Sequence, residues 1–145
     1  MIKISTKGRY GTRAIIDLAI HYRNKPVLLK EIAEREEIPI RYLEQIIIPL
    51  KVAGLVKSVR GAKGGYKLAR APEKIKLSEV IRALEGPCCL VECVDDPDYC
   101  ERVEICPTRE IWEKATRALR EIFDNITVKD LIKIAEKKRK KAVVL

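Results

Sequence analysis

The chain has 145 residues, of which 47% are hydrophobic, and a formal net charge of +9. This length suits one packed domain with an appended oligomerisation element. No run reaches the ~18 apolar residues of a membrane span. No apolar stretch follows the first charges, as one would in a secretory signal. We therefore expect a cytoplasmic protein with no membrane partner.

The charge is unevenly distributed. Residues 1–76 contain 17 Lys and Arg against 7 Asp and Glu, whereas residues 77–127 contain 6 against 12 and residues 128–145 contain 7 against 2. A basic half of this size is typical of a domain that binds a polyanion. Charge alone leaves open a solvated surface rich in Lys and Glu, so the motifs must decide.

The basic half shows helical spacing of its apolar residues in three places. The pattern predicts helices over 5–23, 29–35 and 40–53, with a turn between the second and the third. Pro49 predicts a kink in the third helix, because proline removes a backbone hydrogen bond. Gly54 suits the position just after the end of that helix.

Two alternating segments follow, over 55–59 and 65–68, and the residues between them, RGAKGG, predict a flexible basic hairpin tip. The order of helix, short helix, turn, helix and hairpin is that of a winged helix-turn-helix. We therefore predict a mainly α fold with a small β-hairpin wing, in which residues 1–77 form the winged helix-turn-helix domain.

The next region, residues 78–106, is expected to hold a short helix and a cysteine-bearing loop. Ser78 suits the N-cap of the helix, which would end at Gly86. Pro107 suits the first position of the following helix, which makes Cys106 its N-cap. The acidic cysteine loop between these helices shows no clear period.

Residues 107–140 are expected to form a long dimerisation helix and a C-terminal helix, followed by a frayed tail at 141–145. Thr127 and Asp130 resemble the capping box of a helix over 128–140. The long helix carries an apolar stripe that a monomer would leave exposed. The stripe consists of Ile111, Ala115, Ala118 and Ile122.

The candidate DNA-reading residues lie at the start of the third helix and in the hairpin tip. A recognition helix places its N-terminal residues against base edges. Glutamine can pair with adenine and glutamate can accept from cytosine N4, whereas arginine or tyrosine can instead bind phosphate. The alternative is a solvated helix face and an ordinary turn, but the combination on one basic domain favours DNA binding. The candidates are Arg41, Tyr42, Glu44 and Gln45 in the helix, with Arg60, Lys63 and Gly64 in the wing.

Several stretches resemble the winged-helix regulator family that includes IscR, NsrR and CymR. They are STKGRYGTRAIIDLA at 5–19, YLEQ at 42–45, GLVKSVRGAKGGYKLA at 54–69, the three-cysteine segment, and CPTREIW at 106–112. The resemblance implies a homodimer on partly palindromic double-stranded DNA. It also implies that the long helix crosses to the partner subunit.

All five cysteines lie between positions 88 and 106, which indicates a metal or redox site more than a disulfide framework. Cys93, Cys100 and Cys106 follow the spacing C-x6-C-x5-C. The resemblance implies that these three hold an iron–sulfur cluster, with 2Fe–2S favoured over 4Fe–4S, and thiolate sulfur is a suitable ligand for it. Zinc and bare thiols that sense oxidation remain alternatives.

The fourth ligand stays unassigned. The two positions where relatives carry a ligand hold Arg109 and Arg9 here. The only histidine, His21, falls inside the first predicted helix and is expected at the surface. The remaining candidates are Cys88, Cys89, Glu92, an acidic residue of 95–101, or a small thiol.

The resulting hypothesis is a DNA-binding transcription regulator whose DNA binding is modulated by an iron–sulfur cluster, for iron–sulfur, redox or cysteine-metabolism sensing. The alternative is a cluster-free winged-helix repressor, controlled by a partner protein or by thiol oxidation. An enzyme is not expected, because the sequence has no nucleophile–base pair, no phosphate-binding loop and a single histidine.

Overall fold

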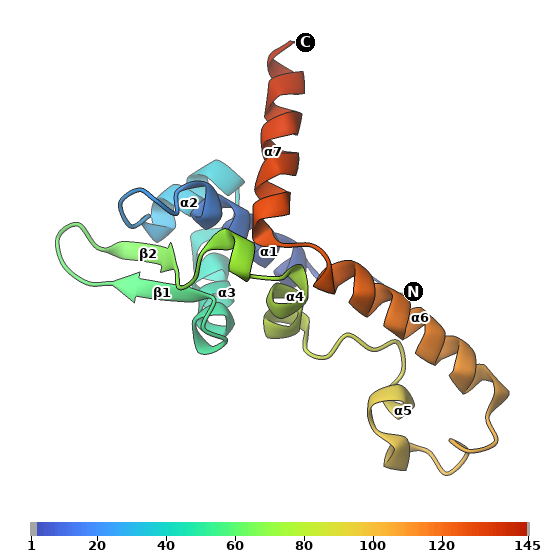
Figure 1. Ribbon diagram of the computed structural model, residues 1–145. Coiled ribbons are helices and arrows are strands. Elements are labelled where there is room, and N and C mark those ends of the chain that lie inside the picture. Colours follow the sequence, from blue (N-terminus) through green and yellow to red (C-terminus); the bar gives the residue numbers. More distant parts are fainter. Residues whose placement is uncertain (1–2, 145) are drawn as a thin grey trace.

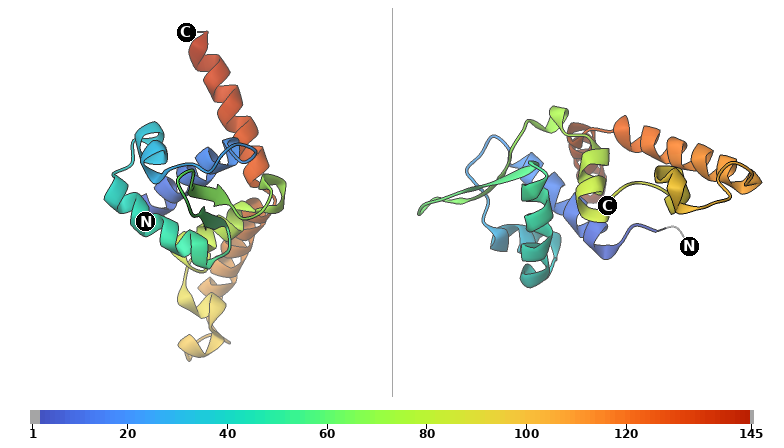
Figure 2. Two further views of the ribbon diagram at one scale, coloured as in Figure 1. Left: turned by 90° about the vertical axis from the view of Figure 1, so that its left-hand side faces the viewer. Right: turned by 90° about the horizontal axis from the view of Figure 1, so that it is seen from below.

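The computed structural model describes residues 3–144. A helical body carries a two-stranded wing on one side, while a long helix and the cysteine-bearing loop extend from the other side (Figures 1 and 2). The predicted fold class, mainly α with a small hairpin wing, is confirmed. Within residues 3–144, no helix has the length and apolar character needed to cross a bilayer.

Three helices open the body, as predicted: α1 (Thr6–Ile20), α2 (Leu29–Glu36) and α3 (Ile40–Val52). Helix α1 begins after Ser5, whose hydroxyl accepts a hydrogen bond from the Gly8 backbone N–H at 3.0 Å. It ends earlier than the predicted residue 23, because His21 is its C-cap. Helix α3 continues through Pro49 as one element and is followed by Gly54 at φ +70°.

The wing consists of β1 (Val56–Val59) and β2 (Gly65–Leu68), which pair antiparallel. A bridge joins β2 to the loop after α1: the Val27 N–H donates to the Tyr66 carbonyl at 2.9 Å, and the Tyr66 N–H donates to the Val27 carbonyl at 2.7 Å. Gly65 has φ +150°, and a Cβ there would lie 2.5 Å from the Val27 carbonyl oxygen. Glycine therefore lets the base of the wing approach this loop.

One hydrophobic core unites α1, α2, α3, the wing strands and α4 (Leu77–Glu85). Gly11 lets α4 pack closely on α1, because a Cβ at that position would lie 2.4 Å from Leu84 Cδ1. The fully buried Asp17 accepts two hydrogen bonds of 2.8 Å from Arg35, which ties α1 to α2. The fully buried side chains include Ile15, Leu18, Ile32, Leu43, Ile46, Leu50, Leu55, Leu68 and Val80.

The N-terminus of α4 differs from the prediction. The helix begins at Leu77 after the N-cap residue Lys76, whose backbone N–H donates to Glu79 Oε2 at 2.9 Å. Ser78 lies inside the first turn, so its predicted role as N-cap is wrong. The N-cap lies two residues earlier than predicted, because a short 3-10 helix, η1 (Pro72–Lys74), and Ile75 lead directly into the helix.

Two helices complete the chain, α6 (Pro107–Asp124) and α7 (Val128–Val143). The predicted caps are confirmed: Cys106 is the N-cap of α6, and Thr127 and Asp130 form a capping box on α7. Helix α7 continues through residues 141–143, which the prediction placed in a frayed tail, and residue 145 lies outside the described residues. Hydrogen bonds from Leu77 N–H to the Ile126 carbonyl and from Val128 N–H to the Ile75 carbonyl fix the start of α7 to the body.

Candidate functional site

Helix α3 turns one face to the core and the other to solvent. Leu43, Ile46 and Leu50 are fully buried, whereas Arg41, Glu44 and Gln45 are exposed. With 3.6 residues per turn, these three polar side chains share one face of the helix. The buried face fixes the helix to the core. The exposed polar face is accessible to a binding partner.

Tyr42, a predicted DNA-reading residue, is half-buried and has a packing role that the sequence did not reveal. Its ring meets that of Tyr10 edge to face, with centroids 5.9 Å apart. The Arg13 guanidinium lies 5.5 Å from the centre of the Tyr10 ring and pairs with Glu36 at 3.1 Å. The aromatic pair therefore fixes the start of α3 against α1.

The predicted wing residues lie at the tip of the hairpin. Arg60 and Lys63 are exposed, and neither takes part in an ion pair within residues 3–144. A Cβ at Gly64 would lie 2.3 Å from the Val59 carbonyl oxygen, so only glycine fits this tight tip. The wing therefore presents two unpaired cations on a narrow support, which suits contact with phosphates.

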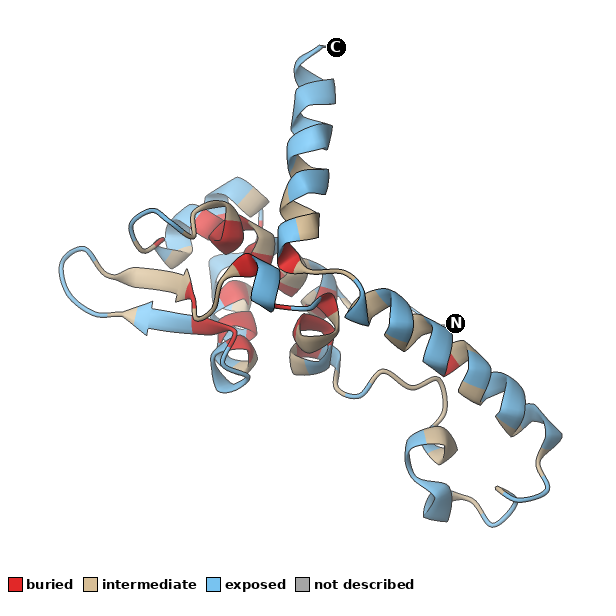
Figure 3. Cartoon of the chain, viewed as in Figure 1, coloured by how far each residue is buried: buried red, intermediate tan, exposed pale blue. Residues whose placement is uncertain are grey.

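The residues between α4 and α6, 86–106, form a loop that we call the cysteine segment. It contains two short elements, α5 (Glu92–Asp95) and the 3-10 helix η2 (Pro97–Tyr99), and none of its residues is buried (Figure 3). All five cysteines in it are free thiols of intermediate exposure.

Polar contacts from α6 hold the cysteine segment. Arg120 Nε donates to the Cys88 carbonyl at 2.8 Å, and the same guanidinium pairs with Asp95. Arg109 Nε donates to the Cys93 carbonyl at 3.2 Å. Neither arginine binds a thiol through these contacts, because each donates to the backbone or to a carboxylate.

The structure does not bring the predicted cluster ligands Cys93, Cys100 and Cys106 together. Over residues 3–144, no group of three or more His, Cys, Asp or Glu side chains is arranged to hold a metal ion. The same finding covers Cys88, Cys89, Glu92 and the acidic residues of 95–101. Three thiols are chemically suitable for an iron–sulfur cluster, but their arrangement here does not fit one.

Two thiols of the segment differ in acidity. The Thr108 hydroxyl, 3.3 Å from Cys106 Sγ, lowers the pKa of the Cys106 thiol, and backbone amides at the start of α6 act in the same direction. Burial, together with the nearby Asp95 carboxylate, raises the pKa of the Cys89 thiol. Cys106 therefore supplies the larger fraction of thiolate at neutral pH, as its predicted N-cap position implies.

Helix α6 presents its predicted apolar stripe to solvent. Ile111 is 56% exposed and Ile122 54% exposed, with Ala118 exposed and Ala115 half-buried between them. The opposite face meets the cysteine segment, where the buried Thr116 hydroxyl accepts from the Leu90 N–H at 3.2 Å. One face of α6 thus packs within the chain, while the other has no partner among the described residues.

The sequence prediction missed the residues that position the cysteine segment, namely Thr108, Thr116 and Arg120, and treated Arg109 only as a missing ligand. One available signal was charge, since the segment is acidic and basic residues recur on the following helix. That signal identifies neither the partner of each arginine nor the carbonyl groups that accept from it.

Comparisons with known proteins agree with the fold described above. Residues 4–134 match the family model described as Rrf2, iron-dependent transcriptional regulator. The HTH-type transcriptional regulator IscR of Vibrio campbellii is 36% identical over 132 residues, which cover 91% of this chain and 78% of that protein.

Two solved structures are also similar. The structure of CymR, described as the global cysteine regulator of B. subtilis, has a TM-score of 0.78 and 43% identity, covering 92% of this chain and 98% of that one. T. potens IscR has a TM-score of 0.78 and 45% identity, covering 94% and 90%. The relatives are regulators, in agreement with the prediction that the protein is not an enzyme. The chain belongs to the Rrf2 family of DNA-binding transcriptional regulators.

Proposed function

We propose that this regulator binds partly palindromic double-stranded DNA as a homodimer, with α3 in the major groove and the wing against the backbone or the minor groove. The observation that carries the proposal is the exposed polar face of α3, next to the unpaired cations of the wing. Helix α3 carries groups that can discriminate bases, and the wing carries charges that neutralise phosphates.

Selection of genomic fragments, followed by fluorescence anisotropy at several salt concentrations, tests the DNA contacts. Arg60→Ala and Lys63→Ala each weaken binding to all sequences and reduce the salt slope by about 1. Glu44→Ala and Gln45→Ala instead change the preferred sequence. Lys138→Ala, which removes an exposed cation of α7, serves as the control. Failure to enrich any site under reducing conditions, with or without added iron and sulfide, contradicts the proposal.

The stripe on α6 supports the homodimer, because two such stripes can cover one another. Ile111→Asp or Ile122→Asp then yields monomers with greatly reduced affinity for DNA, since a dimer engages two half-sites about one helical turn apart. Arg117→Asp, at an exposed position outside the stripe, leaves the dimer intact. Sedimentation velocity measures both effects, and a wild-type monomer at micromolar concentration contradicts the dimer.

For control of DNA binding, we propose the cysteine segment, which lies in the chain between the body and α6. The family resemblance favours an iron–sulfur cluster on Cys93, Cys100 and Cys106, and binding one requires the segment to rearrange so that the three thiolates converge. A bound cluster changes DNA affinity only to the extent that it binds one arrangement of the protein more tightly than another. This difference is typically ~1–3 kcal/mol.

Iron and sulfide analysis of protein purified without oxygen tests the cluster. The charge-transfer absorption of the cluster disappears when Cys93, Cys100 or Cys106 is replaced by alanine. Cys88→Ala and Cys89→Ala retain the absorption unless one of them is the fourth ligand. Protein that takes up neither iron nor sulfide contradicts the cluster, as do loaded and unloaded forms that bind every fragment equally well.

The second candidate is a cluster-free repressor controlled by thiol oxidation or by a partner protein. The lack of a convergent ligand set and the lowered pKa of the Cys106 thiol favour it. The similarity to CymR, the global cysteine regulator of B. subtilis, is compatible with it. Under control by thiol oxidation, metal-free protein changes its DNA affinity on mild oxidation, and Cys106→Ser removes the change. Equal affinity before and after oxidation contradicts thiol control.

A further inference from the structure

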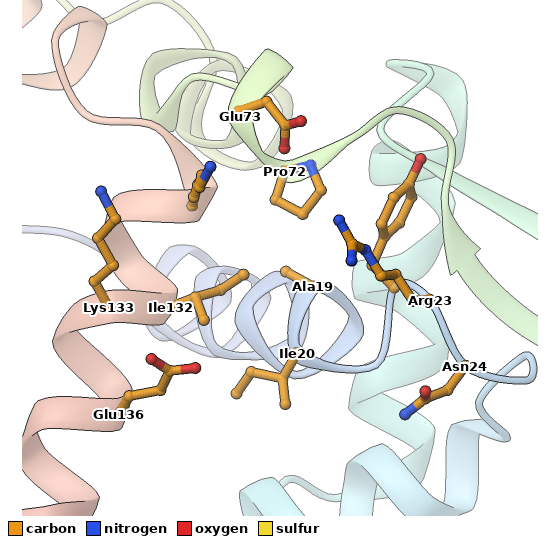
Figure 4. Close-up of a pocket in the computed structure, with 11 residues that line it drawn as sticks. Ala19, Ile20, Arg23, Asn24, Pro72, Glu73, Ile132, Lys133 and Glu136 are labelled. Atoms are coloured by element: carbon orange, nitrogen blue, oxygen red, sulfur yellow. The ribbon is translucent and has the colours of Figure 1, made fainter.

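A cavity of ≈ 550 Å³ lies between the C-terminal end of α1, η1 and the first turns of α7 (Figure 4). Ala19 and Ile132 line it with apolar surface, and Pro72 of η1 adds to this surface. Charged side chains surround these apolar groups. The cavity is separate from the polar face of α3, the wing tip and the cysteine segment.

The charged groups come from opposite walls and carry both signs. Lys129, Lys133 and Glu136 belong to α7, Arg23 follows the end of α1, and Glu73 lies on η1. The neutral amide of Asn24 lies next to Arg23 in the chain, and Figure 4 shows both beside the end of α1. Among residues 3–144, Lys133 has only its own-helix neighbour Asp130 as an ion-pair partner, at 3.6 Å. Arg23, Glu73 and Glu136 form no ion pair in the same part of the chain.

We propose that this cavity binds a small zwitterion, an L-α-amino acid. Arg23 and Asn24 hold its carboxylate on the α1 wall, Glu136 holds its ammonium group on the α7 wall, and the side chain lies on the apolar surface. The mixed lining favours a molecule that carries both charges. A plain anion leaves Glu73 and Glu136 without a partner, and Arg23, Lys129 and Lys133 together repel a plain cation.

The position of the cavity connects it to the wing. Its α1 wall continues, three residues after Asn24, into Val27, which pairs with Tyr66 of β2. Its η1 wall follows β2 after a short connection. Its third wall is the helix that follows α6. A ligand that bridges these walls fixes α7 relative to the base of the wing, so we expect it to change DNA affinity. This consequence rests on the proposed function, whereas the binding itself does not.

Amide chemical-shift mapping of the full-length protein tests the binding. L-alanine is compared with propionate, which lacks the ammonium group, and with ethylamine, which lacks the carboxylate, and then the other common L-amino acids are added singly. We expect at least one amino acid to give saturable shifts at residues 22–24, in η1 and at the start of α7. Propionate and ethylamine should leave these amides unchanged. The proposal is overturned if no amino acid shifts them at millimolar concentration, or if propionate shifts them as strongly.

Variants separate the site from non-specific binding. Arg23→Gln and Glu136→Gln each lower the affinity for the amino acid by about tenfold, equivalent to ~1.4 kcal/mol, because each removes one charge-assisted hydrogen bond. Neither residue is buried or ion-paired, so the fold stays intact. Lys138→Gln, on α7 but outside the cavity lining, leaves the affinity unchanged. Unchanged affinity in both cavity variants overturns the assignment.

Anisotropy with a selected DNA fragment measures the coupling, with and without a saturating amount of the amino acid that binds. A change in DNA affinity that Arg23→Gln abolishes supports the link to the wing. Amino-acid binding with unchanged DNA affinity overturns that link. If the protein binds no DNA fragment, the proposed DNA contacts fail, while the chemical shifts still decide whether the cavity binds the amino acid.

Discussion

The winged body and the cysteine segment are held in place by different forces. The body surrounds a continuous core in which side chains such as Ile46 and Leu50 are fully buried. The cysteine segment has no buried residue, and it keeps its position through a few hydrogen bonds from α6. Close packing gives the proposed DNA-reading surface one defined shape. A segment held by partly exposed polar contacts opens at low free-energy cost, which suits the controlling role proposed for the cysteine segment.

The largest expected difference between the two regions is in the free energy of unfolding. Ile46→Ala removes fully buried methyl and methylene groups and should lower the stability by ~2–5 kcal/mol. Val103→Ala, in the cysteine segment, should cost less than ~1 kcal/mol, because Val103 is only half-buried. Urea denaturation measures both. Equal losses would mean that the segment packs as tightly as the body.

A smaller effect is expected at the contact between α6 and the cysteine segment. In the unsubstituted protein, the ion pair with Arg120 holds the pKa of the Asp95 carboxyl below its ordinary value. Arg120→Gln removes this ion pair and weakens the hydrogen bond to the Cys88 carbonyl. Amide hydrogen exchange over residues 88–96 should rise by about five- to tenfold, as expected for ~1 kcal/mol from a partly exposed charged contact.

The body provides the reference for that measurement, since exchange in α1 and α3 should stay unchanged. Arg117→Gln is the matched control, because Arg117 is an exposed arginine of the same helix without an ion pair in residues 3–144. Faster exchange throughout the body would show that the two regions do not open independently.

The smallest expected effect concerns the reactivity of single thiols in the segment. Because its pKa is lowered, Cys106 should react with iodoacetamide at neutral pH faster than Cys89, whose pKa is raised. Thr108→Val removes the hydroxyl that lowers the pKa, so the pKa rises, the thiolate fraction falls and alkylation of Cys106 slows severalfold. Mass spectrometry of singly labelled protein gives both rates. An unchanged rate at Cys106 would exclude Thr108 as the cause.

Much of the body could be predicted because its signals are local. Apolar periodicity identified α1, α2 and α3, and the glycines and alternating residues around 55–68 identified the wing. The cap at Thr127 was equally readable, since a capping box joins residues only three positions apart. The boundary of α4 was not, because Ser78 has the right chemistry for an N-cap while the preceding chain determines where the helix begins.

Other features could be found only from the tertiary structure, because they join residues that lie far apart in the sequence. The Arg120 contacts with Cys88 and Asp95 join positions 32 and 25 residues apart, and the packing of Tyr42 on Tyr10 also crosses between helices. The cysteine spacing indicated the donor chemistry but not whether the thiols converge, because long-range contacts from α6 determine the path of this loop. The cavity beside α1 likewise arises only when α7 returns to the body, since no local pattern brings Arg23 and Glu136 to opposite walls. The sequence by itself thus determined the main helices, the wing and the types of chemistry that they carry, and long-range packing decided which of those groups face one another.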